Sequence, residues 1–368
     1  MSPAKLFNKN HFKIEINKPD EYMINFFEKK KNKIESAINN IIRKKVKEKN
    51  TFYIINNNNE NEIELIFKFN NRLDIYKLKF GETKFSEISI KIKDQIDIEP
   101  YNNSFCELFS DVYCLVRNID NTLIITSPKK ILYTHYFDCM ITSIELLSQK
   151  NINEDNKSKL VFIGDEKGYL HLVEIFYDFN HSEKAYEIKN ILIKKTVKAQ
   201  NKYIKGLYYD ERLNLIFSWS DDNFISINND YSLDFMNIIT IEKNNIIKEI
   251  LVSKYDLIYI SCYNRIRGVY SIFSYTLNGI MISFYESPVK IIKCFFDEKI
   301  VIIHSNNNIF TYNLYTFDEV ALSSYCDFNK ESKGLQTEIE YCYFYPQINY
   351  YLMICGDNKG YFYKLEKE

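Results

Sequence analysis

The chain has 368 residues, of which 46% are hydrophobic and 26% are charged, a composition typical of a folded protein with a large core. Its 48 Lys and Arg balance 49 Asp and Glu, so no global basic excess holds it to nucleic acid, and we expect no nucleic-acid partner. Thirty Tyr and 27 Phe favour strands. Because only nine Gly and six Pro are present, Asn is expected to form many of the turns.

Two further features concern the compartment. No apolar run reaches the roughly 18 residues of a membrane-spanning helix, and the first residues lack the apolar core of a signal peptide. The eight cysteines are scattered without a C-x-x-C pair, which predicts reduced, mostly buried thiols, with Cys262, Cys294 and Cys355 inside apolar strands. These features predict a cytoplasmic protein.

Residues 1–50 differ in character from residues 51–368, and we predict a separate N-terminal segment followed by one domain. Residues 28–49 carry nine Lys or Arg against three Glu, and Ile34, Ile38, Ile41 and Ile42 fall at helical spacing. This pattern predicts a Lys-rich helix whose Ile stripe packs on the wall of the following domain. The alternative is a helix that docks on an anionic membrane.

From residue 51 onward, a pattern of strand, tight polar turn and second strand recurs seven times. The first strands are spaced by about 48 residues on average, close to the length of a four-stranded propeller blade. The predicted hairpins are Ile63–Phe69 with Leu73–Phe80, Thr122–Thr126 with Lys130–Tyr136, Leu160–Ile163 with Tyr169–Ile175, Leu215–Ser218 with Phe224–Asn228, Leu257–Cys262 with Val269–Tyr275, Ile300–His304 with Ile309–Leu314, and Leu352–Cys355 with Tyr361–Leu365.

Two of these hairpins have nearly the same turn, Gly164–Tyr169 and Gly356–Tyr361. In each, the second Gly (Gly168 or Gly360) is expected to supply a positive φ, and the Asp to bond the backbone of its own turn. The Gly spacing does not form a phosphate-binding loop, because no Gly-Lys-Ser/Thr follows.

Further apolar runs lie beside several hairpins, such as Ile204–Tyr209 before one and Met236–Glu242 after it. Four short antiparallel strands repeated seven times predict an all-β fold, a seven-bladed WD-repeat-like β-propeller, with eight blades as the alternative. The last hairpin lacks a fourth strand. We expect His11–Ile16 to supply it, with Phe12, Ile14 and Ile16 facing inward, or else Thr51–Ile55.

The N-terminal residues carry a family resemblance. Pro3–Phe7 (Pro-Ala-Lys-Leu-Phe), followed by Asn10-His11, resembles the closing motif of the BEACH domain in neurobeachin-like proteins, although Ser2 replaces Thr and Asn10 replaces Pro. In that family a WD-repeat propeller follows directly. Ser271–Gly279 is similar to a hairpin of those propellers, and Leu215–Asn229 (with Ser-Trp-Ser-Asp-Asp) resembles the Ser-Gly-Ser-x-Asp hairpin of WD repeats.

The resemblance implies a non-catalytic scaffold in membrane or vesicle trafficking, cytoplasmic and peripheral to endomembranes. Its partners would be other proteins bound through propeller loops, together with a BEACH domain encoded upstream of Met1. The sequence departs from the WD pattern, since no Trp-Asp dipeptide ends a repeat, no Gly-His opens one, and Trp219 lies one strand too early. The hydrogen-bonded tetrad of WD repeats is therefore expected to be absent or substituted.

A search for reaction chemistry finds no signature. The five His have no zinc-ligand spacing, no G-x-S-x-G elbow is present, and Asp221-Asp222 is not part of a calcium loop. We therefore expect no catalytic, cofactor-binding or metal-binding residues, and no enzyme. The alternative is an enzyme framed by a propeller, in which titratable groups would converge at the mouth of the channel.

The remaining candidate is a protein-binding face formed by the turns and by the connections between repeats. Arg265 and Arg267 flank Ile266 in a long turn, and arginine suits contact with an anionic peptide or a phosphate. A stand-alone peptide-binding propeller unrelated to BEACH proteins would use the same face, and ordinary solvated loop charge is the plain alternative. The predicted protein-binding residues are Asp165, Lys167, Asp221, Asp222, Arg265, Arg267, Asp357 and Lys359.

Overall fold

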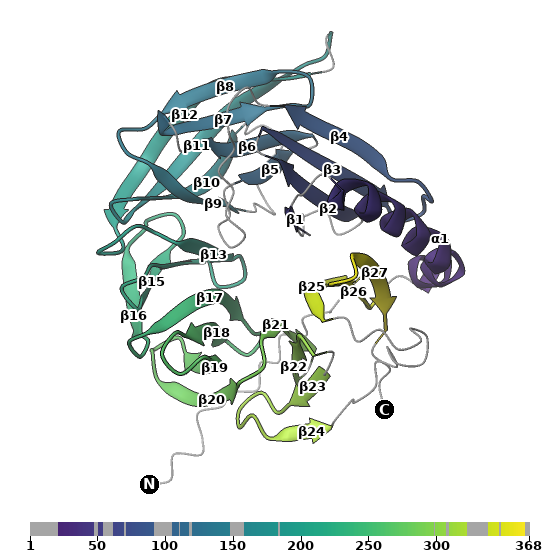
Figure 1. The fold of residues 1–368 in the computed structure, drawn as a ribbon. Helices are drawn as coiled ribbons and strands as arrows, with labels where there is room; N and C mark the ends of the chain where they lie inside the picture. The colour runs from purple at the N-terminus through teal and green to yellow at the C-terminus, as the bar shows by residue number, and fades with distance from the viewer. Residues whose placement is uncertain are drawn as a thin grey trace.

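The computed structural model describes residues 21–47, 51–53, 62–69, 71–91, 105–109, 111–117, 120–147, 158–182, 185–297, 299–306, 309–321, 338–345 and 347–364. These ranges contain one α-helix and 27 strands. The strands form seven sheets arranged around a ring, as Figure 1 shows. The prediction of an all-β, seven-bladed β-propeller with a helical N-terminal segment is confirmed.

Each sheet is one blade, numbered here in chain order. Blade 1 contains β1 (Thr51–Tyr53), β2 (Glu62–Phe69), β3 (Arg72–Lys79) and β4 (Ser86–Lys91), and blade 2 contains β5 (Phe105–Phe109), β6 (Val112–Arg117), β7 (Thr122–Thr126) and β8 (Ile131–Tyr136). Blade 3 contains β9 (Ile141–Leu147), β10 (Ser158–Asp165), β11 (Tyr169–Asn180) and β12 (Ala185–Lys198), and blade 4 contains β13 (Gly206–Asp210), β14 (Leu215–Trp219), β15 (Phe224–Asn229) and β16 (Phe235–Thr240). Blade 5 contains β17 (Asn245–Val252), β18 (Leu257–Asn264), β19 (Val269–Thr276) and β20 (Met281–Ser287), and blade 6 contains β21 (Ile291–Asp297), β22 (Lys299–His304), β23 (Ile309–Tyr312) and β24 (Glu319–Ala321). Blade 7 contains β25 (Ile339–Tyr345), β26 (Tyr350–Cys355) and β27 (Lys359–Tyr363).

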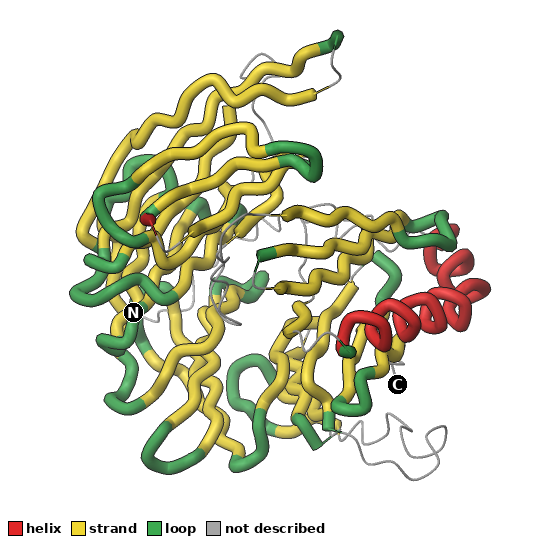
Figure 2. The backbone as a smooth tube through the Cα atoms, turned by 45° about the horizontal axis from the view of Figure 1, so that its top comes forward, coloured by secondary structure: helices red, strands yellow, loops and turns green. Residues whose placement is uncertain are grey.

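Strands that follow one another along the chain pair antiparallel within each blade, and Figure 2 shows the turns that join them. Because the direction alternates from strand to strand, the turns between second and third strands lie at the same end of every blade as the connections between blades. We call this end of the ring the turn face. Turns between third and fourth strands lie on the opposite face.

All seven predicted hairpins are present, but one holds a different place in its blade. Six of them join the second and third strands, whereas Thr122–Thr126 and Lys130–Tyr136 form β7 and β8, the third and fourth strands of blade 2. The second strand of that blade is β6, a buried apolar run that pairs with β7. The recurring pattern therefore counted this hairpin with the other six, although it lies one strand later in its blade.

The turns use asparagine where glycine is scarce, as predicted. Among the described residues, six Asn adopt a positive φ, at 121, 214, 223, 244, 349 and 358. Gly168 has the expected positive φ (83°), but the prediction for Gly360 is wrong, because Asn358 (φ 59°) takes the left-handed conformation in that turn. The two aspartates bond their own turns as expected: Asp165 Oδ1 accepts from the Lys167 amide at 2.9 Å, and Asp357 Oδ1 accepts from the Lys359 amide at 3.2 Å.

The core consists of apolar side chains between adjacent blades rather than one central cluster. Val116 and Ile125 of blade 2 pack with Ile144 and Val161 of blade 3, and all four are buried. Each such side chain contributes about 1.5–3 kcal/mol on burial. The seven described cysteines are free thiols, and Cys262 and Cys355 are buried in strands as predicted.

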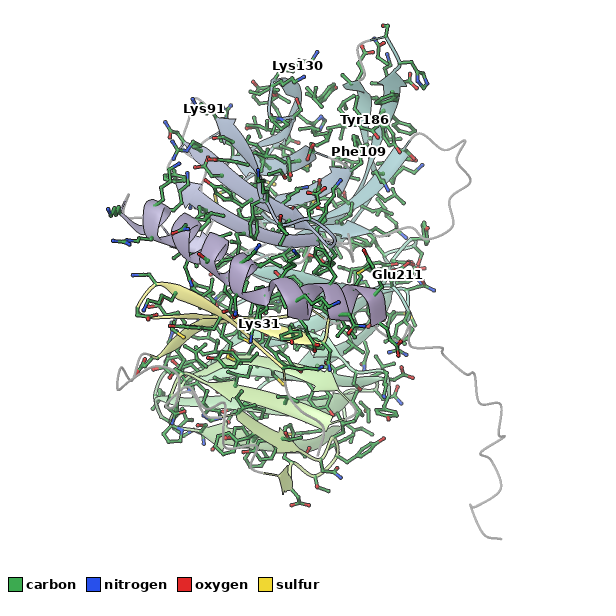
Figure 3. The ribbon with its side chains drawn as sticks, turned by 90° about the vertical axis from the view of Figure 1, so that its right-hand side faces the viewer. Lys31, Lys91, Phe109, Lys130, Tyr186 and Glu211 are labelled. Carbon is green, nitrogen blue, oxygen red and sulfur yellow. The ribbon has the colours of Figure 1, made fainter. Side chains whose placement is uncertain are left out.

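The helix α1 (Glu21–Val46) bridges the last blade and the first. Its stripe of Ile34, Ile38 and Ile42 is buried in one cluster with Phe362 of blade 7 and Phe67 of blade 1. Figure 3 shows α1 lying across these blades, with Lys31 on the helix. The prediction that the Ile stripe packs on the propeller is therefore confirmed.

At its two ends the helix is fixed by different contacts. Near the start of the helix, the Phe27 ring lies 4.8 Å from the Phe362 ring, centroid to centroid. Near its end, the buried Lys45 donates from Nζ to Asp74 Oδ2 of blade 1 at 2.6 Å. The helix thus contacts both blades that must meet to close the ring.

The helix also lies along the outer edge of β27, where a fourth strand would pair. The backbone N–H of Gly360 donates to Asn39 Oδ1 and that of Phe362 donates to Glu35 Oε1, each at 2.8 Å. The expected edge strand at His11–Ile16, with Phe12, Ile14 and Ile16, lies outside the described residues. The alternative donor is wrong, because Thr51–Tyr53 forms β1 and pairs with β2 in blade 1.

Gly360 is required at this edge for space rather than for its φ. A Cβ atom there would lie 2.9 Å from Ile38 Cγ2 on the helix, closer than real contacts allow. The glycine therefore lets α1 approach the strand closely. No helix among the residues that the structure describes is long and apolar enough to cross a membrane.

Candidate protein-interaction site

The eight predicted protein-binding residues lie in four turns of the turn face. Two of them flank or follow each of the second strands β10, β14, β18 and β26. Five side chains are exposed, Asp222 and Asp357 are half-buried, and Asp165 is buried. The exposed residues are Lys167, Asp221, Arg265, Arg267 and Lys359.

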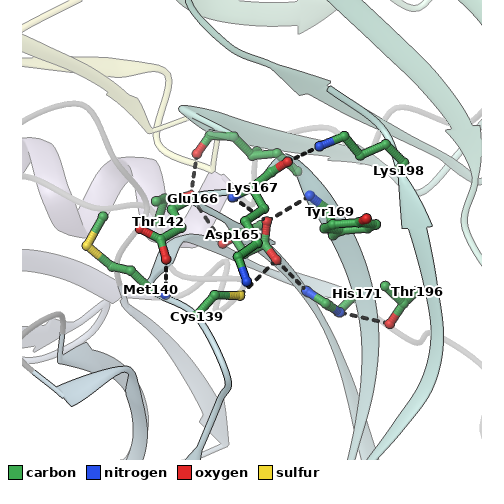
Figure 4. A network of polar contacts seen from close by, with 12 residues as sticks. Cys139, Met140, Thr142, Asp165, Glu166, Lys167, Tyr169, His171, Thr196 and Lys198 are labelled. Atoms are coloured by element: carbon green, nitrogen blue, oxygen red, sulfur yellow. Dashed lines mark hydrogen bonds and ion pairs between the residues drawn. The ribbon is translucent and has the colours of Figure 1, made fainter. Parts of the chain in front are cut away.

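Asp165 is the centre of a polar network inside blade 3, which Figure 4 shows from close by. Its Oδ2 atom accepts from Cys139 Sγ at 3.0 Å and from His171 Nε2 at 3.2 Å. Because a carboxylate only accepts, the Nε2 atom of His171 carries the proton, and Nδ1 can accept from the Thr196 hydroxyl at 2.8 Å. The network joins the turn after β10 to β11, to β12 and to the connection before β9.

The electrostatics of this network indicate a structural role. Burial raises the pKa of Asp165, but the hydrogen bonds from His171, Cys139 and the Tyr169 amide lower it by more. The net pKa lies below its usual value, so the carboxyl stays ionised. Burial and the bond to Asp165 raise the pKa of the Cys139 thiol to about 12, so that thiol is a donor and not a nucleophile. A hydrogen-bonded network is therefore present in blade 3 without a Trp-Asp or Gly-His dipeptide.

The turn between β18 and β19 is held rigidly by one buried side chain. Asn264 Oδ1 accepts from the amides of Ile266 at 3.1 Å and Arg267 at 3.0 Å, and its carbonyl accepts from Gly268 N at 2.9 Å. Ile266 at the tip is 76% exposed. An exposed apolar side chain on a fixed turn is suited to a partner's pocket.

The two arginines of this turn differ in their contacts. Arg267 donates to both carboxylate oxygens of Glu286, at 3.2 and 2.7 Å, and lies 3.7 Å from Glu242. Among the residues that the structure describes, the guanidinium of Arg265 makes no hydrogen bond or ion pair. The guanidinium donors of Arg265 are therefore uncommitted within the part of the chain that the structure describes.

Arg265 belongs to a group of cations that sequence analysis did not identify. We call Lys205, Lys248, Arg265 and Lys290 the basic cluster, because the charges of the other three lower the pKa of Lys248. Lys205 and Lys290 lie in the connections before β13 and β21, and such connections share the turn face, so the topology offered a signal for them. No sequence signal marked Lys248, which lies in the innermost strand of blade 5.

One carboxylate lies against the basic cluster. Asp221 accepts from Lys205 Nζ at 3.0 Å and from the Tyr203 hydroxyl at 2.7 Å. Burial raises the pKa of Asp221, but those two bonds and the charges of Lys205 and Arg265 lower it by more, so the net pKa lies below its usual value. Of the predicted residues, the structure therefore brings together Asp221 and Arg265, while the pairs in blades 3 and 7 lie in their own turns.

A second charged group lies between blades 1 and 2, inside the core. Lys77 Nζ lies 2.7 Å from Glu107 Oε1 and 3.1 Å from Glu64 Oε1. Burial raises the pKa of Glu64 to about 8, the neighbouring Glu107 raises it too, and Lys77 opposes both. The described residues contain no group of His, Cys, Asp and Glu that could hold a metal ion.

Comparison with known proteins bears on the fold alone. No family model matches the chain and no curated protein matches it, so the BEACH-like motif at Pro3–His11 has no support from relatives. A chain of the crystal structure of the mitotic checkpoint complex is similar over 83% of this chain and 85% of that one, with TM-score 0.52 and 11% identity. BBS1N in complex with ARL6DN, soaked with lead, is similar over 86% and 91%, with TM-score 0.55 and 13% identity. The same complex soaked with mercury has TM-score 0.54, with 13% identity over 86% and 92%. The class of protein is a seven-bladed β-propeller whose structural neighbours are propellers of the WD40 type.

Proposed function

We propose that this protein is a non-catalytic scaffold that binds partner proteins on the turn face of its propeller. The observation that carries the proposal is the Asn264-held turn, which presents Ile266 at 76% exposure beside the uncommitted guanidinium of Arg265. An exposed apolar anchor beside an arginine is the composition typical of interface hot spots. The neighbouring propellers supply further support, since their structures are those of complexes.

Seven of the eight predicted residues remain candidates for direct contact. Asp165 contributes by fixing its turn, because both of its carboxylate oxygens accept bonds from within blade 3. An enzyme would need titratable groups converging at the mouth of the channel. The carboxylate beside the basic cluster, Asp221, is already bonded to Tyr203 and Lys205.

A trafficking role in a BEACH-family protein, cytoplasmic and peripheral to endomembranes, forms the finer part of the proposal. Its support is the resemblance of Pro3–Phe7 and Asn10-His11 to the end of a BEACH domain. Genomic sequence upstream of Met1 tests it. An open reading frame for a BEACH domain there would support the family, and its absence would leave a propeller scaffold without that role.

In this proposal, contact with an anionic membrane is electrostatic. The Ile stripe of α1 is buried against the propeller, so the helix has no apolar face to insert, but Lys29, Lys33, Lys44 and Lys47 are exposed. Co-sedimentation with anionic and neutral vesicles tests this part. Reversal of Lys29, Lys33 and Lys44 to Glu should abolish salt-sensitive binding; Lys45 is kept, because it pairs with the buried Asp74. Equal binding by that variant would remove membrane contact from the proposal.

The scaffold function itself is tested by quantitative affinity capture with the full chain. The variant Arg265→Glu/Ile266→Asp alters the turn face. The matched control Lys130→Glu/Ile131→Asp makes the same change in the exposed turn before β8, on the opposite face. We expect a set of captured proteins that the first variant loses and the control keeps. Capture that is identical for the wild type and both variants would contradict the turn-face proposal.

A further inference from the structure

We propose that the basic cluster is the docking site for an anionic segment of a partner protein, a peptide rich in carboxylate or phosphate groups. The inference rests on the proposed scaffold function and names the chemistry of the partner. The four cations come from three successive blades, with Lys205 before β13, Lys248 on β17, Arg265 after β18, and Lys290 before β21. The three outside β17 lie on the turn face, and their charges act on Lys248.

The backbone of blade 5 places Lys248 at a bulge. In the β17–β18 register, Ile247 pairs with Cys262 and Glu249 with Ser261, which leaves Lys248 between two pairs. Bulges re-aim a side chain relative to its neighbours on the strand. Equivalent bulges on the innermost strands of blades 3, 6 and 7 leave Thr142, Ile292 and Glu340 in this position, so among these four bulges a cation stands only in blade 5.

Four acidic side chains beside the cluster are already engaged in ion pairs or hydrogen bonds. Asp221 is the carboxylate bonded to the cluster, through Lys205, while Glu249 pairs with Lys293 and Glu286 pairs with Arg267. Asp222 accepts from the Asn201 amide at 3.0 Å. Burial lowers the pKa of Lys248, and the charges of Lys205, Arg265 and Lys290 lower it further, so an incoming anion would relieve their mutual repulsion.

Side chains beside the cluster favour a peptide over a bare ion. Ile266 is 76% exposed and adjoins Arg265, and Tyr203 is 36% exposed with its hydroxyl on Asp221. These side chains would contact the apolar residues between the anionic ones. Arginine and tyrosine are enriched among interface residues that carry most of the binding energy.

Selection from a random displayed peptide library on the full chain tests the proposal. We expect enrichment of peptides rich in Asp and Glu, and a loss of at least about tenfold in affinity of a selected, synthesised peptide for Arg265→Glu/Lys290→Glu, measured by fluorescence anisotropy. Lys129→Glu/Lys130→Glu, the same reversal of two charges in the exposed turn before β8 on the opposite face, is the matched control and should bind the peptide as the wild type does.

Each other outcome counts against the proposal or refines its chemistry. The proposal would be overturned by enrichment of neutral or basic peptides, by no enrichment, or by equal binding of the charge-reversed variant. The scaffold function is tested separately, by affinity capture. A selected peptide with Asn and Gln in place of its acids should lose binding. A copy with phosphoserine in their place separates the two sources of charge, since tighter binding indicates phosphate and weaker binding indicates carboxylate.

Discussion

The Glu35 carboxylate accepts a 2.8 Å hydrogen bond from the backbone N–H of Phe362, although Glu35 lies on a helix and Phe362 on the last strand of the propeller. Asn39, one helical turn further, does the same for Gly360. Side chains four residues apart on the helix thus lie opposite backbone N–H groups two residues apart on the strand. Two side chains of α1 supply the acceptors that a fourth strand would have supplied from its carbonyls.

Removal of these acceptors should loosen the edge of blade 7. We expect Glu35→Ala/Asn39→Ala to lower the free energy of unfolding by about 2 kcal/mol and to speed amide exchange in residues 359–363. Hydrogen exchange measured by mass spectrometry checks both. Ser36→Ala, on the exposed side of the same helix, is the control, and unchanged exchange in the double variant would show that the helix does not protect this edge.

Gly360→Ala should destabilise the protein by about 1–3 kcal/mol, because its Cβ would lie 2.9 Å from Ile38 Cγ2. Gly356→Ala, where the added Cβ meets nothing closer than 3.6 Å, should be tolerated. Denaturant unfolding measures both. In an Ile38→Ala background Gly360→Ala should lower the free energy of unfolding by less, because Ile38 Cγ2 is absent. Strictly additive effects of the two substitutions would contradict the packing argument.

Stability should depend on pH through Glu64. Its pKa in the folded protein is raised from 4.5 to about 8, so the protonated form is favoured by folding. The contribution of Glu64 is therefore fully present below pH 4.5 and is lost as the pH rises to about 8. Relative to Glu64→Gln, the wild type should lose at least about 1 kcal/mol over this interval, measured by urea unfolding. Glu82→Gln, at an exposed site, should leave the pH profile unchanged; a wild type that gains stability relative to Glu64→Gln would reverse the sign and refute the assignment.

The thiols should resist alkylation in the native state. Burial raises the pKa of Cys262 and Cys294. The pKa of Cys106 is raised by the hydrogen bond between its thiol and Cys114, and then by burial. Alkylation with iodoacetamide at neutral pH should modify these three only after unfolding, as read by peptide mass spectrometry. Rapid native labelling of Cys262 or Cys294, or a disulfide between Cys106 and Cys114, which face each other across β5 and β6, would contradict this prediction.

Repetition and periodicity made the fold predictable, because seven polar turns between apolar strands leave few other arrangements. Register was not predictable from the turn sequences. The nearly identical turns at Gly164–Tyr169 and Gly356–Tyr361 differ, since Gly164 pairs with Leu170 whereas Cys355 pairs with Lys359. In blade 3 His171 anchors the turn aspartate, whereas Tyr363 holds the corresponding position in blade 7. A short turn motif therefore does not by itself fix the register of its hairpin.

For the helix and for the candidate site, local features were predictable from the sequence, whereas the residues that they contact were not. The spacing of the Ile residues predicts the apolar stripe of α1. The strand β27, which packs against it, lies more than three hundred residues away in the sequence, and no local pattern identifies it as the partner. The turns of the candidate site were predictable from topology. The basic cluster was not, because it combines a bulge, a turn and two connections whose residues meet only when three blades stand side by side.

The pairing of α1 with β27 also has a consequence for biosynthesis. At translation rates of about 5–20 residues per second, the ribosome completes the helix tens of seconds before Lys359–Tyr363 emerges. During that interval Ile34, Ile38 and Ile42 have only the first blade to cover them, so the nascent chain carries a partly uncovered apolar stripe until β27 emerges. Messages cut short before Lys359 would yield a chain that keeps this stripe permanently, a signal that chaperones and proteases can use to separate incomplete chains from finished ones.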